Sequence, residues 1–442
     1  MKSLQLVLFA FLLDNITSSQ SQNKNVIREA RPVYIHPLTN SINQFGFRLS
    51  IKMMENSSNN IVISPTSVAG LLSMTLLGSV GKTYDELAAA LGFSQDILIN
   101  RNNHEEFGEL LNTLGGISPA STTLSASAVA VDARARLRNE YRAYLNRIYK
   151  GDVINVNFED STETKKIINE WVSRHTEGHI NDFLKQPLRF DTRVVLLNAL
   201  YFSGQWAYPF LPEHTRNMSF VTPCEVVNAE LMLNTGEFDY VFSPNLGAHM
   251  IALPYNDSIT TMYVLKPYGP KRLSLPELMR QLDHEIINNL INEMTTTKVV
   301  IRFPKMQLES KIDLTNTFKA LGLTSMFSQG IANFALMVDS KQFQNVSEVQ
   351  ILSRINSEDE TAVRDVKEIL NHLPNPNIYV DSVLHDVRLT IDEFGTEAAA
   401  VTSGILARTA ELFYADSPFF MFIRDERTKL ITFSAAIFDP TI

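Results

Sequence analysis

The chain has 442 residues, of which 45% are apolar and 20% charged, with a formal net charge of −9. This composition supplies enough apolar material for one large globular domain or several smaller ones. The acidic balance argues against general nucleic-acid binding, which needs a basic face. No run of about 18 apolar residues occurs, so we expect no membrane-spanning helix. Cys224 is the single cysteine, which rules out a disulfide within the chain.

The N-terminus has the layout of a secretory signal. Lys2 is followed by an almost wholly apolar stretch from Leu4 to Leu13 and then by polar sequence. This predicts a signal peptide over residues 1–19 and a secreted, extracellular protein; a buried helix is the alternative. Residues 20–38 are polar, so we expect a disordered tail. Asn-X-Ser sequons, which fit export, mark four candidate glycosylation sites: Asn56, Asn217, Asn256 and Asn345.

The first elements are predicted to be helices. Residues 43–54 are too mixed for their periodicity to assign a structure. Ser64 and Pro65 are typical of a helix N-cap and first turn, and the apolar stretch 68–77 predicts a helix that is buried all round.

A second helix is predicted from Thr83, which forms a capping box with Glu86, to Gly92. An apolar stripe predicts a third helix: Leu137, Tyr141, Tyr144, Leu145 and Ile148. Alternation predicts a strand at 125–131, and a continuous apolar run predicts one at 194–202. Further strand candidates lie at 152–158, 250–253, 261–265, 298–302, 387–391, 419–423 and 430–438. Helices gather in the first half and strands in the second, which indicates an α+β fold with large sheets.

Residues 338–376 differ from their surroundings because they are polar, acidic in the middle and close with two prolines. Ser357 and Glu360 form a capping box ahead of an apolar stripe, which predicts one amphipathic helix; the stripe consists of Val363, Val366, Ile369, Leu370 and Leu373. We interpret this segment as a surface insertion with one docked helix; a partner-binding module is the alternative.

Several segments partly match motifs of enzymes and cofactor sites, but each lacks a residue that its motif requires. His175 and His179 have zinc-ligand spacing, but Gly178 weakens the helix and no glutamate follows the first histidine. Residues 78–83 resemble the end of a phosphate loop, but Leu76 stands where its first glycine should be. No nucleophile elbow occurs. We therefore expect no metal, no cofactor and no enzymatic activity.

The densest basic stretch lies between Arg134 and Lys150. Arg138 and Arg142 share a helical face, but the other basic residues do not clearly join them. We interpret this stretch as a solvated helix face; a polyanion-binding patch is the less favoured alternative.

The segment from Asp392 to Asp416 is the most informative. From Thr396 on, alternate residues are small or apolar, and Glu397 is the only charge ahead of Arg408. Because side chains alternate faces along a strand, this segment can enter a sheet with one face buried. Its glycines and serine equally suit an exposed loop. The segment therefore fits two structural states.

A series of longer motifs is ordered along the chain: 60–67, 77–83, 169–180, 197–206, 253–255, 303–306 and 418–423. Together they resemble the serpin family of serine protease inhibitors, from about Leu38 to Ile442. The resemblance implies one serpin domain over residues 39–442, with an α+β fold of three sheets and about nine helices. It also implies an exposed reactive-centre loop over residues 393–416 and a monomer.

In the mechanism that the resemblance implies, a serine protease attacks the loop, which then inserts into the main sheet and traps the attached protease. The inhibitory hinge corresponds to Glu393, Gly395, Thr396, Glu397, Ala398, Ala399, Ala400 and Val401. Lys305 and Glu393 match an ion pair at the top of the main sheet near Trp206, which implies gating roles. A non-inhibitory carrier or storage serpin is the alternative.

The bond to be cut is expected near Arg408. The family's usual spacing from Glu393 places Thr409 before the cut, whereas Arg408 is the only basic residue between Glu393 and Arg424. A trypsin-like pocket strongly prefers arginine. We expect an extracellular, trypsin-like protease to cut Arg408–Thr409; cleavage after Thr409 or Leu406 by another protease is the alternative.

Overall fold

The computed structural model describes residues 37–55, 59–97, 99–114, 116–117, 120–269, 273–338, 370, 373–394 and 410–442, which belong to one compact unit. The helices are α1 (Pro37–Met54), α2 (Pro65–Leu77), α3 (Gly81–Leu91), α4 (Asn100–Leu114), α5 (Asn139–Tyr149), α6 (Ser161–His175), α7 (Leu275–Met279), α8 (His284–Glu293) and α9 (Thr315–Ala320), with 3₁₀ turns η1 (Pro212–His214) and η2 (Ser325–Phe327). Within these ranges no helix is both long and apolar enough to cross a membrane.

The strands are β1 (Ile61–Ile63), β2 (Gly116–Ile117), β3 (Ser121–Asp132), β4 (Asp152–Val156), β5 (Val194–Gly204), β6 (Arg216–Val221), β7 (Val226–Ser243), β8 (Ala248–Pro254), β9 (Thr260–Pro267), β10 (Thr295–Pro304), β11 (Met306–Asp313), β12 (Val380–Ile391), β13 (Glu411–Tyr414), β14 (Phe419–Asp425) and β15 (Ile431–Ile437).

Helix α2 begins and α3 ends as the sequence predicts. The Ser64 side chain accepts a hydrogen bond from the backbone N–H of Ser67, and Pro65 occupies the first turn of α2. Gly92 ends α3 with a φ of 74°, a left-handed conformation that only glycine adopts without steric cost.

The predicted capping box at Thr83 is wrong. Helix α3 begins two residues earlier, at Gly81, so Thr83 lies within its first turn. The Thr83 hydroxyl accepts a hydrogen bond from the backbone N–H of Asn333, and Glu86 accepts hydrogen bonds from Ser325. Both side chains therefore join α3 to a segment distant in sequence, because tertiary partners compete successfully with a local cap.

The described strands form two hydrogen-bonded sheets. One has six strands, in the order β11-β12-β5-β3-β2 with β4 beside β3; the other has nine, in the order β1-β15-β14-β9-β8-β7-β10-β13 with β6 beside β7. The three sheets implied by the resemblance are joined into two because the 18-residue strand β7 pairs with β6 and β10 and then with β8.

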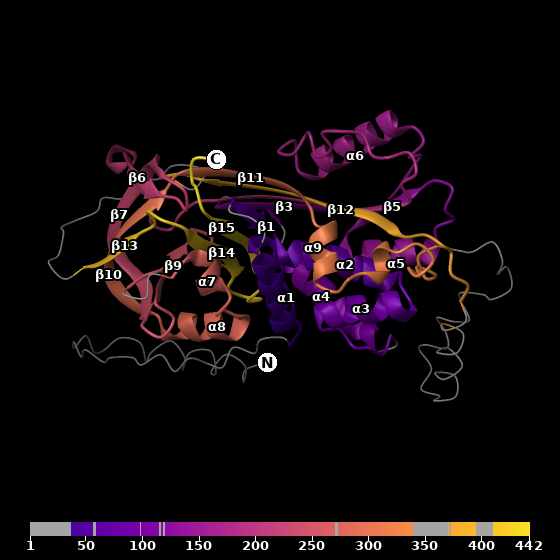
Figure 1. Cartoon of the computed structure of the whole chain (residues 1–442), viewed down its shortest axis with the longest axis horizontal. Helices are drawn as coiled ribbons and strands as arrows, with labels where there is room; N and C mark the ends of the chain where they lie inside the picture. Colours follow the sequence, from indigo (N-terminus) through magenta and orange to yellow (C-terminus); the bar gives the residue numbers. More distant parts are fainter. Residues whose placement is uncertain are drawn as a thin grey trace, which may run out of the picture. The chain divides into compact units, whose positions relative to one another are not determined.

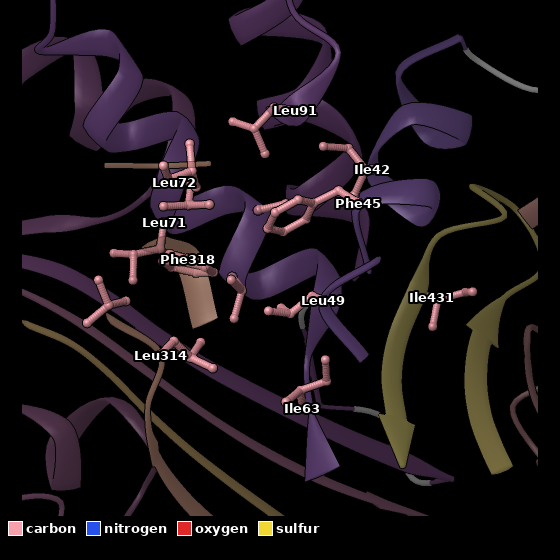
Figure 2. Close-up of a cluster of buried hydrophobic side chains, with 14 of the residues drawn as sticks. Ile42, Phe45, Leu49, Ile63, Leu71, Leu72, Leu91, Leu314, Phe318 and Ile431 are labelled. Atoms are coloured by element: carbon pink, nitrogen blue, oxygen red, sulfur yellow. The ribbon is translucent and has the colours of Figure 1, made fainter. Parts of the chain in front are cut away.

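Helices cover both faces of the six-stranded sheet (Figure 1). On one face the largest apolar cluster joins Phe45 of α1, Leu72 of α2 and Phe318 of α9 (Figure 2). On the other face α6 packs Ile168 and Val172 against β3 and β5. Small alanines on those strands, Ala126, Ala128, Ala130 and Ala199, let the helix approach closely. Helix α6 is therefore attached to the β3–β5 side of the sheet.

Some predictions lie outside the described residues. These are the signal peptide and most of the tail, the hinge from Gly395 to Val401, the bond Arg408–Thr409, the sequons at Asn56 and Asn345, and most of the 338–376 insertion. Leu370, one member of the predicted apolar stripe of that insertion, is described and buried.

Candidate functional site: the seam between β5 and β12

The six-stranded sheet has a parallel pair at its centre. Strands β5 and β12 pair directly, from Val380 opposite Val194 to Leu389 opposite Phe202, and we call this pairing the seam. Their outer neighbours, β3 and β11, both run antiparallel to them. A strand that turned back after β12 would run antiparallel to both β12 and β5. The seam is therefore a geometrically suitable entry point for the segment that follows β12.

Buried polar side chains hold the seam on its core side. His385 of β12 and Asn198 of β5 are opposite each other, and their side chains lie 2.7 Å apart. The backbone N–H of Ser64 donates to His385 Nε2, so Nδ1 carries the proton and donates to Asn198 Oδ1. Burial lowers the pKa of His385 to about 3, which keeps the ring neutral. Asn198 in turn donates to Ser67 Oγ at 2.6 Å.

On the outer side, the segment that connects α6 to β5, residues 176–193, passes over the seam; we call it the crossing segment. The His179 ring stacks on the Tyr201 ring of β5, with centroids 3.8 Å apart. The backbone carbonyl of His179 accepts a hydrogen bond of 2.9 Å from Arg388 of β12. Tyr201 and Arg388 are opposite each other across the seam. One residue of the crossing segment therefore contacts both strands.

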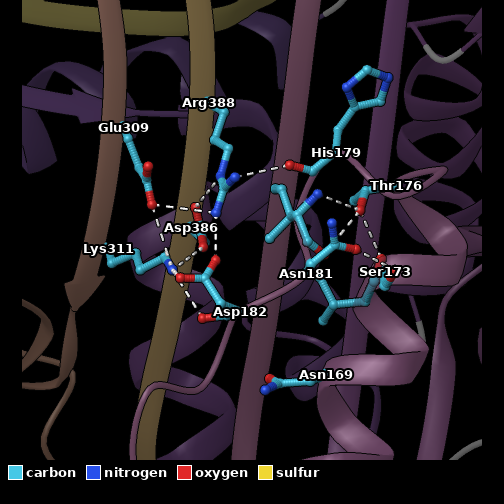
Figure 3. Close-up of polar contacts among 12 residues, drawn as sticks. Asn169, Ser173, Thr176, His179, Asn181, Asp182, Glu309, Lys311, Asp386 and Arg388 are labelled. Carbon is cyan, nitrogen blue, oxygen red and sulfur yellow. Dashed lines mark hydrogen bonds and ion pairs between the residues drawn. The ribbon is translucent and has the colours of Figure 1, made fainter.

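A group of charged side chains fixes the crossing segment to β11 and β12 (Figure 3). Asp182 lies 2.6 Å from Arg388 Nη2 and 2.8 Å from Lys311 Nζ. These contacts, the Lys311 hydrogen bond foremost, lower the pKa of Asp182. Glu309 Oε1 lies 3.2 Å from Arg388 Nη2. The group thus joins two cations from neighbouring strands to one carboxylate above them.

Asp386 is buried within this group without a hydrogen bond to its carboxylate. Its oxygens lie 3.6 Å from Lys311 Nζ and 3.8 Å from Arg388 Nε, and its side chain is 1% exposed. Burial raises the pKa of Asp386 to about 6. This carboxylate is attracted by two cations yet remains poorly solvated.

The backbone just beyond β12 is held at the top of the sheet by Trp206. The indole Nε1 donates to the carbonyl of Asp392 at 2.9 Å, and the Trp206 backbone N–H donates to the carbonyl of Phe394 at 3.2 Å. The ring stacks on Tyr255. Trp206 therefore fixes the chain on either side of Glu393, at the start of the expected hinge.

Glu393 lies between these two carbonyls and is held by its own set of partners. Lys305 Nζ lies 2.9 Å from Glu393 Oε2, the Thr215 hydroxyl donates to Oε1 at 2.8 Å, and the Phe210 N–H donates to the Glu393 carbonyl. Burial alone would raise the pKa of Glu393, but the hydrogen bonds, that from Lys305 first, hold it below its ordinary value. The start of the expected loop is thus an ordered, charged attachment.

The structure describes only the two ends of the expected loop range, and both are attached to strands. Glu393 is buried, and Glu411–Tyr414 already form β13, which pairs in parallel with β10. Phe394 and Ala410 are the described residues nearest to the hinge and the bond Arg408–Thr409.

The two histidines with zinc-ligand spacing and the arginines of the basic stretch have ordinary structural partners. His175 contacts Trp171 and lies 3.5 Å from Asp152, whereas His179 stacks on Tyr201, so the two histidines point to different places. In the basic stretch, Arg134 is paired with Asp132 and Glu159, and Arg147 with Glu105. Asn217 and Asn256, the two described sequon residues, are exposed.

Residues 40–440 match the family model for serpins, described as serine protease inhibitors. The chain belongs to the serpin family. It is 27% identical to serine protease inhibitor 28Dc of Drosophila melanogaster, covering 86% of this chain and 75% of that protein. It is 29% identical to plasminogen activator inhibitor 1 of Sus scrofa, and the match covers 90% of this chain and 91% of that protein. Identity to Iripin-2 of Ixodes ricinus is 29%, covering 90% and 92%. As protease inhibitors, serpins have serine proteases as partners.

The sequence motifs indicate Lys305, Trp206 and Glu393, but they do not indicate the charged group beneath Asp182. The sequence does contain a sign of this group. Glu309 and Lys311 carry opposite charges two residues apart, and so do Asp386 and Arg388. On antiparallel β11 and β12 these residues are paired as opposite charges, Lys311 with Asp386 and Glu309 with Arg388. The register between the strands was needed to see this.

Proposed function

We propose that this serpin is a secreted inhibitor of trypsin-like serine proteases, which it traps by inserting its cleaved loop into the seam. The observation that carries the proposal is the direct parallel pairing of β5 and β12, with the hinge leaving from the end of β12. The hinge from Gly395 to Val401 has no proline, and Thr396, Ala398 and Ala400 would face the core.

The hydrogen-bond balance favours insertion. An entering strand forms a ladder with β5 and another with β12, while the single β5–β12 ladder is lost. The net gain is about one hydrogen bond per inserted residue, at roughly 1 kcal/mol each. About a dozen residues therefore gain on the order of 10 kcal/mol, comparable with the stability of a whole domain. Such a difference can drive displacement of a covalently attached protease.

We propose Arg408–Thr409 as the bond that the target protease cuts. Arginine fits a pocket with an aspartate at its base, and no other basic residue lies between Glu393 and Ala410. After cleavage, the residues up to Arg408 remain joined to β12 and are the ones that insert. Lys305 and Trp206 act as gating residues, because they hold Asp392 to Phe394 at the top of the seam.

Secretion and the domain limits are part of the proposal. Residues 1–19 have a signal-peptide layout, and the exposed sequons at Asn217 and Asn256 are accessible to glycosylation. The 338–376 insertion precedes β12, whereas the hinge follows it. A 12-residue strand is about 40 Å long, so the two should lie at opposite ends of β12.

Incubation with trypsin tests the proposal. We expect an SDS-resistant complex and release of a C-terminal fragment that starts at Thr409. The variant Arg408→Ala should form the complex at least about 100-fold more slowly, because the trypsin pocket then lacks its cation. N-terminal sequencing of the fragment identifies the bond, and a start at Ala407 or Ala410 would instead support the alternative proteases. Cleavage at Arg408 without any complex would overturn inhibition and support a carrier serpin.

A further inference from the structure

Strand β6 forms an open edge of the nine-stranded sheet. Among the strands that the structure describes it pairs only with β7, over six residues from Arg216 to Val221. Other edges are protected in ordinary ways, because β1 and β13 have only three and four residues and β11 carries Glu309 and Lys311. Short strands and charged side chains both hinder the addition of a further strand. Strand β6 is longer, and its single charge, Arg216, lies at its first position.

The backbone groups of Asn217 and Ser219 point away from β7, toward this open edge. Hydrogen-bonded and non-hydrogen-bonded residue pairs alternate along an antiparallel ladder. Asn217 is opposite Glu230, whose carbonyl accepts a hydrogen bond from the backbone between β10 and β11 and not from β6. Val221 likewise donates its N–H outside the ladder, to the carbonyl of Asp416. Asn217 and Ser219 are therefore non-hydrogen-bonded positions, and no backbone group in the described ranges pairs with them.

The same two residues begin and end a sequon, Asn217-Met218-Ser219. The side chains of Asn217 and Ser219 are exposed, whereas Met218 and Phe220 pack against the core on the other face of β6. Nothing in the described part of the chain forms a hydrogen bond with the Asn217 side-chain amide. A group that can accept an oligosaccharide therefore lies beside the unpaired backbone of the edge.

Resting on the secretion proposed above, we propose that Asn217 carries an N-linked oligosaccharide, which covers the β6 edge and prevents a second copy of the chain from adding to it. In the transfer, Asn217 Nδ2 bonds to the anomeric carbon of an oligosaccharide carried on a lipid diphosphate. The bond from that carbon to the diphosphate oxygen breaks, and one amide proton is lost. An added strand would lie about 4.8 Å from β6, within reach of the first sugars, which are bulky and hydrophilic.

The second described sequon provides a matched control. Asn256 lies in the turn between β8 and β9, which are both interior strands of the nine-stranded sheet. The Asp257 side chain closes this turn by accepting hydrogen bonds from the backbone N–H groups of Ile259 and Thr260. An oligosaccharide at Asn256 would therefore add similar bulk and hydrophilicity without covering a strand edge.

Four variants of the protein, secreted from eukaryotic cells, test the proposal by analytical ultracentrifugation. Asn217→Gln and Ser219→Ala both remove the sequon and leave the edge open, so we expect the dissociation constant for self-association to fall at least about tenfold. Asn256→Gln should remain as monomeric as the unaltered protein. Ser219→Lys also removes the sequon but places a charge at the edge, so it should remain monomeric without the oligosaccharide.

Mass spectrometry shows which asparagine is occupied. An empty Asn217 would overturn the proposal, and so would Asn217→Gln that associates no more than the unaltered protein. Association of Asn256→Gln as strong as that of Asn217→Gln, or of Ser219→Lys as strong as that of Ser219→Ala, would overturn the role of the edge. Secretion is judged separately, by recovery of the protein from the medium without residues 1–19. Inhibition is judged by the complex that purified monomers form with trypsin, so its failure leaves this result unaffected.

Discussion

At the scale of single residues, two buried carboxylates near the seam differ in their hydrogen-bond partners. Glu393 and Asp386 are both nearly inaccessible carboxylates, exposed by 6% and 1%. Glu393 has a close cation and two direct hydrogen bonds to its carboxylate, whereas Asp386 has none. Their pKa values accordingly move in opposite directions, which makes opposite predictions for stability.

Replacing Asp386 should stabilise the protein above pH 6. Burial raises the pKa of Asp386 from 3.8 to about 6, so the folded protein holds this proton more tightly than the unfolded chain. The stability contributed by Asp386 therefore falls as pH rises from about 4 to about 6. We expect Asp386→Asn to raise the free energy of unfolding by up to about 3 kcal/mol at pH 7 and by little at pH 4. Denaturant unfolding at the two pH values measures this, and a stability loss at pH 7 would contradict it.

Removing Lys305 should have the reverse effect. The pKa of Glu393 is lower in the folded protein than its ordinary value of 4.5, so Glu393 stabilises the fold when the pH is above 4.5. This stabilisation is lost as the pH falls through the folded-state pKa. We expect Lys305→Met to lower the free energy of unfolding by about 1 kcal/mol at pH 7, and by less at pH 3. Lys82→Met is the control: Lys82 is 66% exposed and 3.8 Å from Glu86, so its loss should change stability by less than about 0.5 kcal/mol.

At the scale of elements, strong local patterns predicted structure well. The strand at 194–202 was predicted because β5 is covered on both faces and reads as a continuous apolar run. Helix α2, apolar all round, was predicted for the same reason. Its caps are local chemistry, so Ser64 and Pro65 were sufficient to place its start.

Elements with one solvated face were harder to predict. Strand β7 alternates exposed and buried residues over 18 positions, and its Glu230, Asn234 and Gly236 interrupt the apolar pattern. Strand β11 alternates charged residues such as Glu309 with apolar ones. The sequence pattern does not assign helix α1, because its buried positions include Thr39, Asn43 and Ser50, whose side chains are hydrogen-bonded to the turn before β15 or to β15 itself. Tertiary partners, which sequence alone does not give, determine these elements.

The proposed insertion of the hinge between β5 and β12 predicts which hinge side chains become buried. Thr396 would face the core after insertion, whereas Glu397 would face outward. We expect Thr396→Arg to convert the inhibitor into a substrate, because insertion would bury an unpaired charge. Glu397→Arg places the same charge on the other face and should retain complex formation. Gel analysis after incubation with trypsin distinguishes them, and equal complex formation by both variants would contradict the assigned faces.

At the scale of the whole molecule, the proposed function requires an uncleaved form less stable than the cleaved one. The nine- and six-stranded sheets and the described helices bury their core without any disulfide, since Cys224 is the only cysteine. Stability must therefore come from packing and hydrogen bonds, including the ladder that the inserted loop would add.

Cleavage of the loop should raise the thermal midpoint. A gain on the order of 10 kcal/mol in a unit of this size corresponds to a rise of about 10 °C or more. Limited digestion by a protease that cuts within residues 402–409 without being trapped, followed by calorimetry, measures this. Cleaved Thr396→Arg is the control and should show a smaller rise. An unchanged midpoint in the cleaved, unaltered protein would support the carrier alternative.

The single residue between β10 and β11 links both attachments of the reactive loop. Strand β10 ends at Pro304 and β11 begins at Met306, so only Lys305 separates a strand of the nine-stranded sheet from one of the six-stranded sheet. Lys305 binds Glu393 at the loop's start, and β10 carries the β13 ladder at the loop's end. If the seam widens as proposed, we expect a displacement of β11 to be transmitted along this continuous backbone to β10, the strand that pairs with β13 at the opposite end of the expected loop.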